Sequence, residues 1–179
     1  MSTKYECGTP GRRQRMEALP PGSPINGIDF LTVVDGEAAP EPLRQRVLRL
    51  RMFSAAGVDT LGAAEIVIEG GVRIPSPSIR WAMALPATVA PGGPAVDPTF
   101  DPSLDAADRA WLASLAASTP SPARWLIVVT EEPGDFSRYR LHLRASPGSD
   151  DPPGDFDPKL STVEFSFKVE CPSPFDCAT

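Results

Sequence analysis

Histidine is almost absent from this sequence, because His142 is the only one among 179 residues. It lies at an outward position of an alternating segment, with Arg140 and Arg144 two residues away on either side. The chain also lacks a G-x-S-x-G turn and an H-E-x-x-H helix, which place catalytic groups in hydrolases. A serine–histidine mechanism therefore has no support, and we expect the protein not to be an enzyme.

Long apolar runs are missing as well. No stretch approaches the roughly 18 apolar residues of a transmembrane helix, and the opening MSTKYECGTPGRRQR lacks the apolar centre of a signal peptide. The formal net charge of -6 and the isoelectric point near 4.8 disfavour binding to nucleic acids or anionic membranes. We therefore expect a cytoplasmic protein that leaves the cell only within a larger assembly.

Cysteine is scarce, with Cys7, Cys171 and Cys177 as the three in the chain. Three thiols in a reducing compartment favour free cysteines or a metal over a disulfide framework. Cys171 and Cys177 have C-x5-C spacing, but two thiolates are too few for a zinc or four-iron site, which takes four ligands. Either the thiols are unconnected and partly buried, or all three, with Cys7 as the third ligand, belong to an incomplete zinc or iron–sulfur site.

Proline and glycine are abundant, 22 and 14 residues, and they leave little room for long helices. Strict apolar–polar alternation predicts half-buried strands at 46–53, 138–144 and 163–171. The run WLIVV at 125–129 is apolar on both sides, which is typical of a central strand. A further β-rich run, IDFLTVVD, occupies residues 28–35.

Turn residues between these runs indicate two hairpins. Gly70 and Gly71 separate two β-branched runs within 65–74, and EEPGD separates the strands expected within 125–144. Six or seven strands with such turn signals predict an all-β fold, an antiparallel, immunoglobulin-like (Ig-like) β-sandwich.

Residues 86–122 interrupt the strand pattern. The segment opens with a Pro/Gly/Ala-rich stretch and continues into a short amphipathic helix, for which Ser103 is the expected cap. We expect its apolar stripe to lie against the sandwich, the alternative being a neighbouring subunit. The stripe consists of Leu104, Ala107, Trp111, Leu112 and Leu115. The predicted division of the chain is an N-terminal arm at 1–24, the sandwich at 25–171 with this insertion, and a cysteine-containing tail at 172–179.

Arginines occupy outward positions of two predicted strands. Such side chains can bridge to acidic neighbours and discourage aggregation between strands. The candidates for partner contact are Arg49, Arg51, Arg138 and Arg140. An ordinary solvated face is the alternative interpretation.

Four segments of the chain resemble segments of a single protein family. In the opening YECGTPGRRQRMEAL, Cys7 precedes Arg12 and Arg13, as at the start of that family. The other similar segments follow in the family's order, the last being the most specific: INGIDFLTVVD (25–35), GDFSRYRLHL (134–143) and FDPKLSTVEFSFKVECPSPFDC (156–177). Together these segments resemble the N-terminal part of baseplate J-like wedge proteins from phage-tail-like contractile injection systems. Residues 86–122 are not matched.

The resemblance implies a structural role without enzymatic activity. Such proteins form wedges around the spike hub and couple the baseplate to the sheath, so the implied partners are other baseplate, wedge, sheath and spike-hub proteins. In the family the chain continues past this point, with further cysteines soon after the FDC motif. We therefore expect a fragment, a split gene or a stand-alone N-terminal domain, in which any metal or iron–sulfur site lacks a ligand.

A second hypothesis is a free-standing sandwich whose loops bind a glycan or a small ligand. Concave loops lined by aromatic residues would favour it. Trp81, Trp111 and Trp125 instead all lie in segments with the pattern of a helix or a strand. The baseplate component is therefore the preferred hypothesis.

Overall fold

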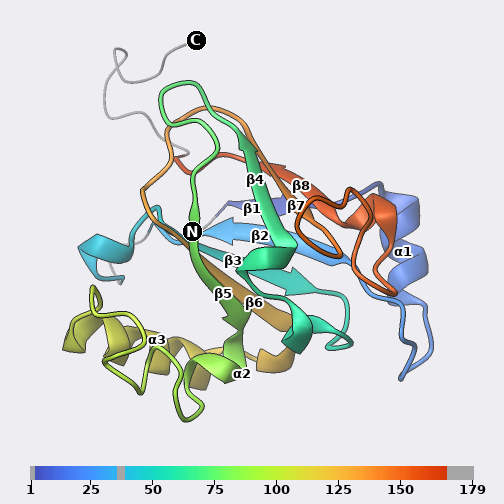
Figure 1. Ribbon diagram of the computed structural model, residues 1–179. Helices are drawn as coiled ribbons and strands as arrows, with labels where there is room; N and C mark the ends of the chain where they lie inside the picture. Colours follow the sequence, from blue (N-terminus) through green and yellow to red (C-terminus); the bar gives the residue numbers. More distant parts are fainter. Residues whose placement is uncertain (1–2, 36–38, 169–179) are drawn as a thin grey trace.

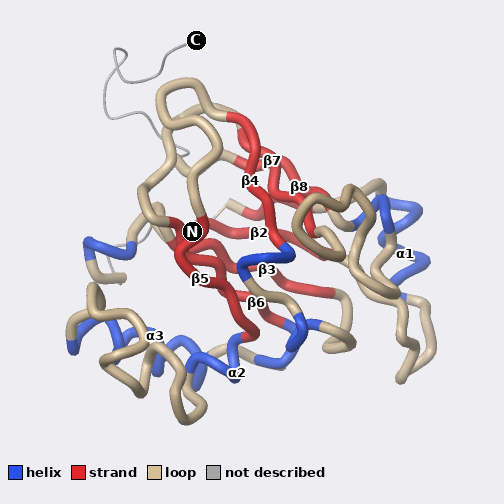
Figure 2. Tube along the Cα trace, viewed as in Figure 1, coloured by secondary structure: helices blue, strands red, loops and turns tan. Residues whose placement is uncertain are grey.

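The structure, a computed structural model, describes residues 3–35 and 39–168. Within these residues the chain forms two antiparallel sheets, with helices mostly at their periphery (Figures 1 and 2). The two-sheet antiparallel arrangement is confirmed. The all-β class is wrong, because residues 10–17 and the 86–122 insertion form helices in a mixed α/β fold, and the strand order does not show an Ig-like topology.

The larger sheet has five strands in the order β1-β2-β3-β6-β5, and every neighbouring pair is antiparallel. β6 lies between β3 and β5, and all six of its residues are buried, which confirms the expected central strand. β2 and β3 confirm the other two strands expected here. The bounds are β1 (Lys4–Glu6), β2 (Ile28–Val33), β3 (Val47–Met52), β5 (Ile79–Ala84) and β6 (Trp125–Thr130).

The smaller sheet has the order β4-β7-β8 and is also antiparallel. Its strands are β4 (Ile66–Gly70), β7 (Tyr139–Leu143) and β8 (Thr162–Phe165). The strand expected at 163–171 is shorter than predicted, because regular pairing ends at Phe165 and residues 169–171 lie outside the described part of the chain.

Both predicted hairpins are wrong. β4 pairs with β7 and not with a strand after the glycines, and β6 and β7 belong to different sheets. Gly70 and Gly71 do have positive φ angles, 98° and 91°, but the chain leaves them in a loop. Alternation fixes which side chains are buried and leaves the choice of neighbouring strand open, so the faces were predictable and the pairing was not.

The main core lies between the two sheets. The expected inward positions of β3 and β7 all contribute to it, as do apolar residues of β2, β4, β6 and β8. The largest fully buried side chains in this layer include Tyr139, Phe167, Ile28, Leu31, Leu48, Leu50, Met52 and Leu126. Burial of this apolar surface is the main force that holds the sheets together.

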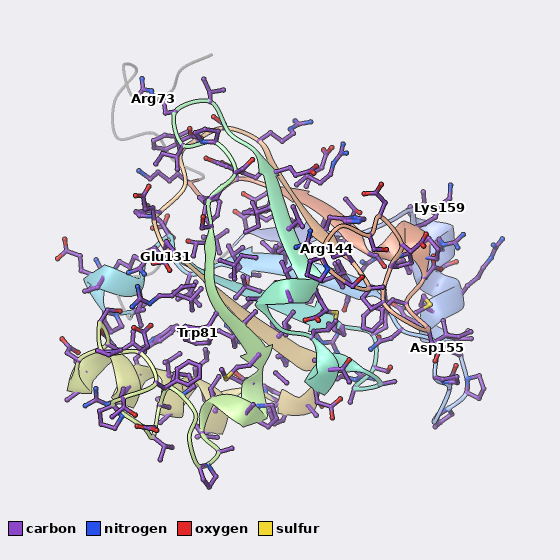
Figure 3. The ribbon with its side chains drawn as sticks, in the orientation of Figure 1. Arg73, Trp81, Glu131, Arg144, Asp155 and Lys159 are labelled. Carbon is purple, nitrogen blue, oxygen red and sulfur yellow. The ribbon has the colours of Figure 1, made fainter. Side chains whose placement is uncertain are left out.

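A second core covers the opposite face of the large sheet. The insertion supplies α2 (Leu85–Thr88) and α3 (Ala106–Ser118), which lie below β5 and β6 in Figure 1. Leu104 and Leu112 are buried here with Trp81, which Figure 3 shows in this layer. The expected apolar stripe therefore contacts the protein's own sheet.

Two predicted details of helix α3 are wrong. Its cap is Asp105 and not Ser103, because Asp105 and Asp108 form a reciprocal capping box with two hydrogen bonds of 2.9 Å. Ala107 was expected in the apolar stripe but is exposed to solvent, whereas Asp108 of the capping box is buried.

The first 24 residues contribute regular structure that sequence patterns did not predict. β1 forms one edge of the large sheet, and α1 (Pro10–Glu17) follows it. The division of the chain into arm, sandwich and tail stays a prediction. Short 3-10 turns lie at η1 (Glu41–Leu43), η2 (Val58–Thr60), η3 (Ala63–Glu65), η4 (Pro122–Arg124) and η5 (Pro158–Leu160). None of the helices within 3–35 and 39–168 is both long and apolar enough to span a membrane.

Candidate functional site

The four candidate arginines form two separate pairs. Arg138 and Arg140 lie at the small sheet, where each guanidinium is 3.5 Å from the carboxylate of Glu164. Their side chains are 81% and 56% exposed, so these ion pairs are well solvated and contribute little to stability. Arg49 and Arg51 lie on β3 of the large sheet, where the surroundings are quite different.

The strand register places Arg49 and Arg51 on the outer face of the large sheet. Lys4 on β1 lies opposite Thr32 on β2, which lies opposite Arg49. In the next row Phe30 lies opposite Arg51, which lies opposite Trp125 on β6. Directly opposed residues share a face, so these side chains line one surface.

The insertion leaves part of this outer face open. A groove of about 530 Å³ lies over β1, β2 and β3, beside the segment that links α3 to η4. We call it the outer-face groove, and it is lined by Lys4, Phe30, Thr32, Arg49, Arg51, Pro120, Ser121 and Trp125.

Arg49 is a partly buried cation of the groove. The centre of its guanidinium lies 4.7 Å from the centroid of the Trp125 ring, and Nη2 donates to the hydroxyl of Thr119 at 3.3 Å. Its Nε is buried and has no hydrogen-bond partner among the described residues. Burial lowers the pKa of Arg49, since the site removes water from the charge without supplying a carboxylate.

Arg51, in contrast, has an acidic partner. Its guanidinium contacts the carboxylate of Asp29, which a bulge between Ile28 and Phe30 turns out of the regular alternation. Asp29 is 5% exposed and also accepts from Arg13 of α1. One buried carboxylate thus links β2, β3 and α1 at the end of the groove.

A second hollow lies on the other side of Arg51. Its volume is about 640 Å³, and α1, the segment after it and the end of β3 form its walls. Arg51 lines both hollows, so they adjoin one another. The apolar part of this wall includes Met16, Leu19, Ile25 and Phe53.

Cys7 is a buried thiol. It is 1% exposed, its Sγ donates to the carbonyl of Thr162 at 3.0 Å, and burial raises its pKa to about 12. Such a thiol stays protonated at neutral pH, whereas a metal ligand must be a thiolate. Cys171 and Cys177 lie outside the described residues, and within residues 3–35 and 39–168 no cluster of His, Cys, Asp and Glu could hold a metal. The three-cysteine metal site stays a prediction.

One family model covers most of the chain. Its description is "Phage baseplate assembly protein, N-terminal domain", and it matches residues 1–165. The chain belongs to this family. The matched range includes the insertion at 86–122, which the resemblance had left unmatched. No curated protein and no solved structure matches the chain.

In this baseplate assembly domain, two of the family-like segments meet at one corner. The main-chain N–H of Asp157 donates to the carbonyl of Asn26 at 2.8 Å, and the fully buried Asn26 amide donates to the carbonyls of Ser54 and Ala56, also at 2.8 Å. Asp157 in turn accepts from Arg12. Figure 3 shows Asp155 and Lys159, which flank this residue, beside α1.

The family-like segment at 134–143 holds the end of the small sheet. The carboxylate of Asp135 accepts from the main-chain N–H groups of Arg73, Ile74 and Ser137 at 2.7–3.0 Å. Burial alone would raise the pKa of Asp135, but these hydrogen bonds outweigh it and hold the pKa well below its usual range. The Tyr139 hydroxyl donates to the carbonyl of Ile74 at 2.8 Å. These family-like residues therefore maintain the fold.

Sequence reasoning found Arg49 and Arg51 but missed the rest of the groove. Lys4 lies in a strand of only three residues, too short for alternation to reveal it. Phe30 and Trp125 have the pattern of core residues, and each is in fact 9% exposed. Asp29 carried a weak signal, because it is an acid inside a strongly apolar run.

Proposed function

We propose that this baseplate assembly domain is a structural component of the wedge of a phage-tail-like contractile injection system. The observation that carries the proposal is the family match over residues 1–165. The domain serves as a rigid adaptor, and its neighbours are other baseplate, wedge, sheath and spike-hub proteins. It carries out no catalysis.

Three features of the described residues support the role of an adaptor. His142, the one histidine, is hydrogen-bonded to the Thr162 hydroxyl at 2.8 Å within the small sheet, away from the two hollows. The two hollows are partly apolar, with arginines at their walls, and such surfaces suit protein contacts. Trp81, Trp111 and Trp125 all pack in or against the second core, which weakens the glycan-binding alternative.

The test is a pull-down of the affinity-tagged chain from cells that produce the injection particle. Mass spectrometry scores sheath, tube, spike and wedge proteins, and the same tag on an unrelated protein of similar size and charge is the control. Co-purification of these subunits in a stable particle supports the proposal. A chain that elutes alone and monomeric while intact particles are present overturns it.

A further inference from the structure

The outer-face groove carries more positive charge than its own acids balance. Lys4, Arg49 and Arg51 line it, and none of its lining residues is acidic. Among the described residues, the acids in ion-pair contact with Arg51 or its neighbour Arg13 are Asp29, which the two arginines share, and Glu6, whose carboxylate lies 4.0 Å from Arg13. Two carboxylates thus face four cations, in a chain whose net charge is -6.

We propose that the outer-face groove binds a carboxylate-bearing segment of a neighbouring baseplate subunit, with the Arg49 guanidinium as the central contact. The inference rests on the proposed function and names the chemistry of the partner. An extended segment with an Asp or Glu side chain fits a groove that lies across β1, β2 and β3. The carboxylate supplies the charged acceptor that Arg49 lacks within the described residues.

The position of Arg49 makes it suited to this contact. Its guanidinium is stacked on Trp125, so the N–H donors of the guanidinium are oriented before a ligand arrives. The neutral Thr119 hydroxyl is its hydrogen-bond partner, and that hydroxyl itself donates to the carbonyl of Leu115 at 2.6 Å. A partly desolvated guanidinium with a neutral partner gains more from an incoming carboxylate than a fully solvated one does.

The walls of the groove are held in place. The Trp125 indole donates to the carbonyl of Pro120 at 3.3 Å, and Ser121 has a φ of 50°, a left-handed conformation that is uncommon outside glycine. Lys4 lies 4.6 Å from the centroid of the Phe30 ring at the open edge. Two of the three basic side chains of the groove, Lys4 and Arg49, are therefore positioned over aromatic rings.

The test begins with overlapping synthetic peptides that cover the other proteins of the same baseplate. Peptides that bind the full chain are measured in solution by fluorescence anisotropy, each beside a version with Asp and Glu replaced by Asn and Gln. The variants are Arg49→Gln and Lys4→Gln in the groove and Arg138→Gln at the small sheet. Arg138→Gln makes the same charge change at a solvated site and is the matched control.

We expect binding peptides to be rich in Asp and Glu and to lose at least about tenfold in affinity when these are neutralised. Arg49→Gln weakens binding by at least about tenfold, Lys4→Gln by about threefold, and Arg138→Gln by less than about twofold. If Arg49→Gln fails to fold by circular dichroism, the exposed Lys4→Gln decides in its place.

Three results overturn the proposal: no peptide binds, the binding peptides are not acidic, or Arg138→Gln weakens binding as much as the groove variants do. A failure here with successful co-purification of the particle leaves the proposed function intact. A failure of the pull-down removes the proposed function, whatever the peptides show.

Discussion

The Arg12 guanidinium donates two hydrogen bonds of 2.8 Å to the carboxylate of Asp157, which lies 145 residues further along the chain. Arg13, the next residue, donates to the carbonyl of Cys7 and contacts Asp29 on β2. The two arginines of the family-like opening thus fasten α1 both to β2 and to the segment that contains Asp157. Their role is structural, which explains why a short basic cluster occurs in an acidic protein.

Asp157→Asn is therefore expected to lower the midpoint of thermal unfolding by a few degrees, because the charge-assisted, two-point contact with Arg12 is lost. Asp155→Asn is the matched control, since it removes the same charge at an exposed side chain two residues away. Differential scanning calorimetry measures both. Equal midpoints for the two variants would show that the Arg12 contact does not stabilise the domain.

A second prediction concerns Gly134, which opens the family-like segment at 134–143. A Cβ at this position would lie 1.9 Å from Cδ2 of Phe167, a fully buried ring. Gly134→Ala must displace this ring, so it should lower the free energy of unfolding by about 2 kcal/mol. Gly11→Ala is the control, because a Cβ added to Gly11 in α1 would have no neighbouring group within 4 Å. Urea unfolding compares the two, and a neutral Gly134→Ala would contradict the close packing.

The strands and Gly134 show which features of the fold the sequence can reveal. Alternation correctly predicted the buried faces of β3 and β7, because a period of two follows directly from strand geometry. It did not predict that β4 pairs with β7, since pairing depends on contacts between residues far apart in the chain. The close approach of Gly134 to Phe167 has no local signal for the same reason.

Helix α1 was missed for a different reason. Its sequence, PGRRQRME, buries only Met16, so it carries no apolar stripe. Thr9 as N-cap and Pro10 in the first turn are the signals that could have found it. For the groove, the sequence indicated the two arginines on β3, while the contributions of Lys4 and Trp125 depend on the strand order.

A third prediction follows from the environment of Cys7. Because burial raises the pKa of this thiol to about 12, iodoacetamide at pH 8 should leave Cys7 unmodified in the folded chain and label it fully in urea. Peptide mass spectrometry reads the modification at each cysteine separately. Rapid labelling of Cys7 without denaturant would show that the thiol is accessible, and would favour the predicted role of Cys7 as a metal ligand.

The last prediction concerns Asp101, which fastens the insertion to β5. Its carboxylate accepts from Arg80 at 2.7 and 2.8 Å, from the Trp81 indole at 3.1 Å and from the Ser103 hydroxyl at 2.7 Å. Burial alone would raise the pKa of Asp101, but these hydrogen bonds outweigh it and lower the pKa to about 2.

A carboxylate whose pKa is lower in the folded state stabilises the fold above its unfolded pKa, and this contribution is lost as the pH falls through the folded value. For Asp101 the contribution is complete above about pH 4 to 5 and disappears toward about pH 2. Asp101→Asn should therefore lower the free energy of unfolding by about 2 kcal/mol at pH 6, and the difference from the natural chain should shrink steadily toward pH 2.

Urea unfolding at pH steps between 6 and 2 measures this difference, with Asp59→Asn as the same chemical change at an exposed position. A constant difference across the whole range would mean that Asp101 acts through shape and hydrogen bonding, and that its ionisation is not coupled to folding. A difference that follows the expected slope would instead show that one buried carboxylate holds the insertion against β5. The insertion also forms one wall of the outer-face groove, but the side chains that donate to Asp101 do not line it; these are Arg80, Trp81 and Ser103. Asp101→Asn at pH 6 should therefore weaken the binding of acidic peptides less than Arg49→Gln does.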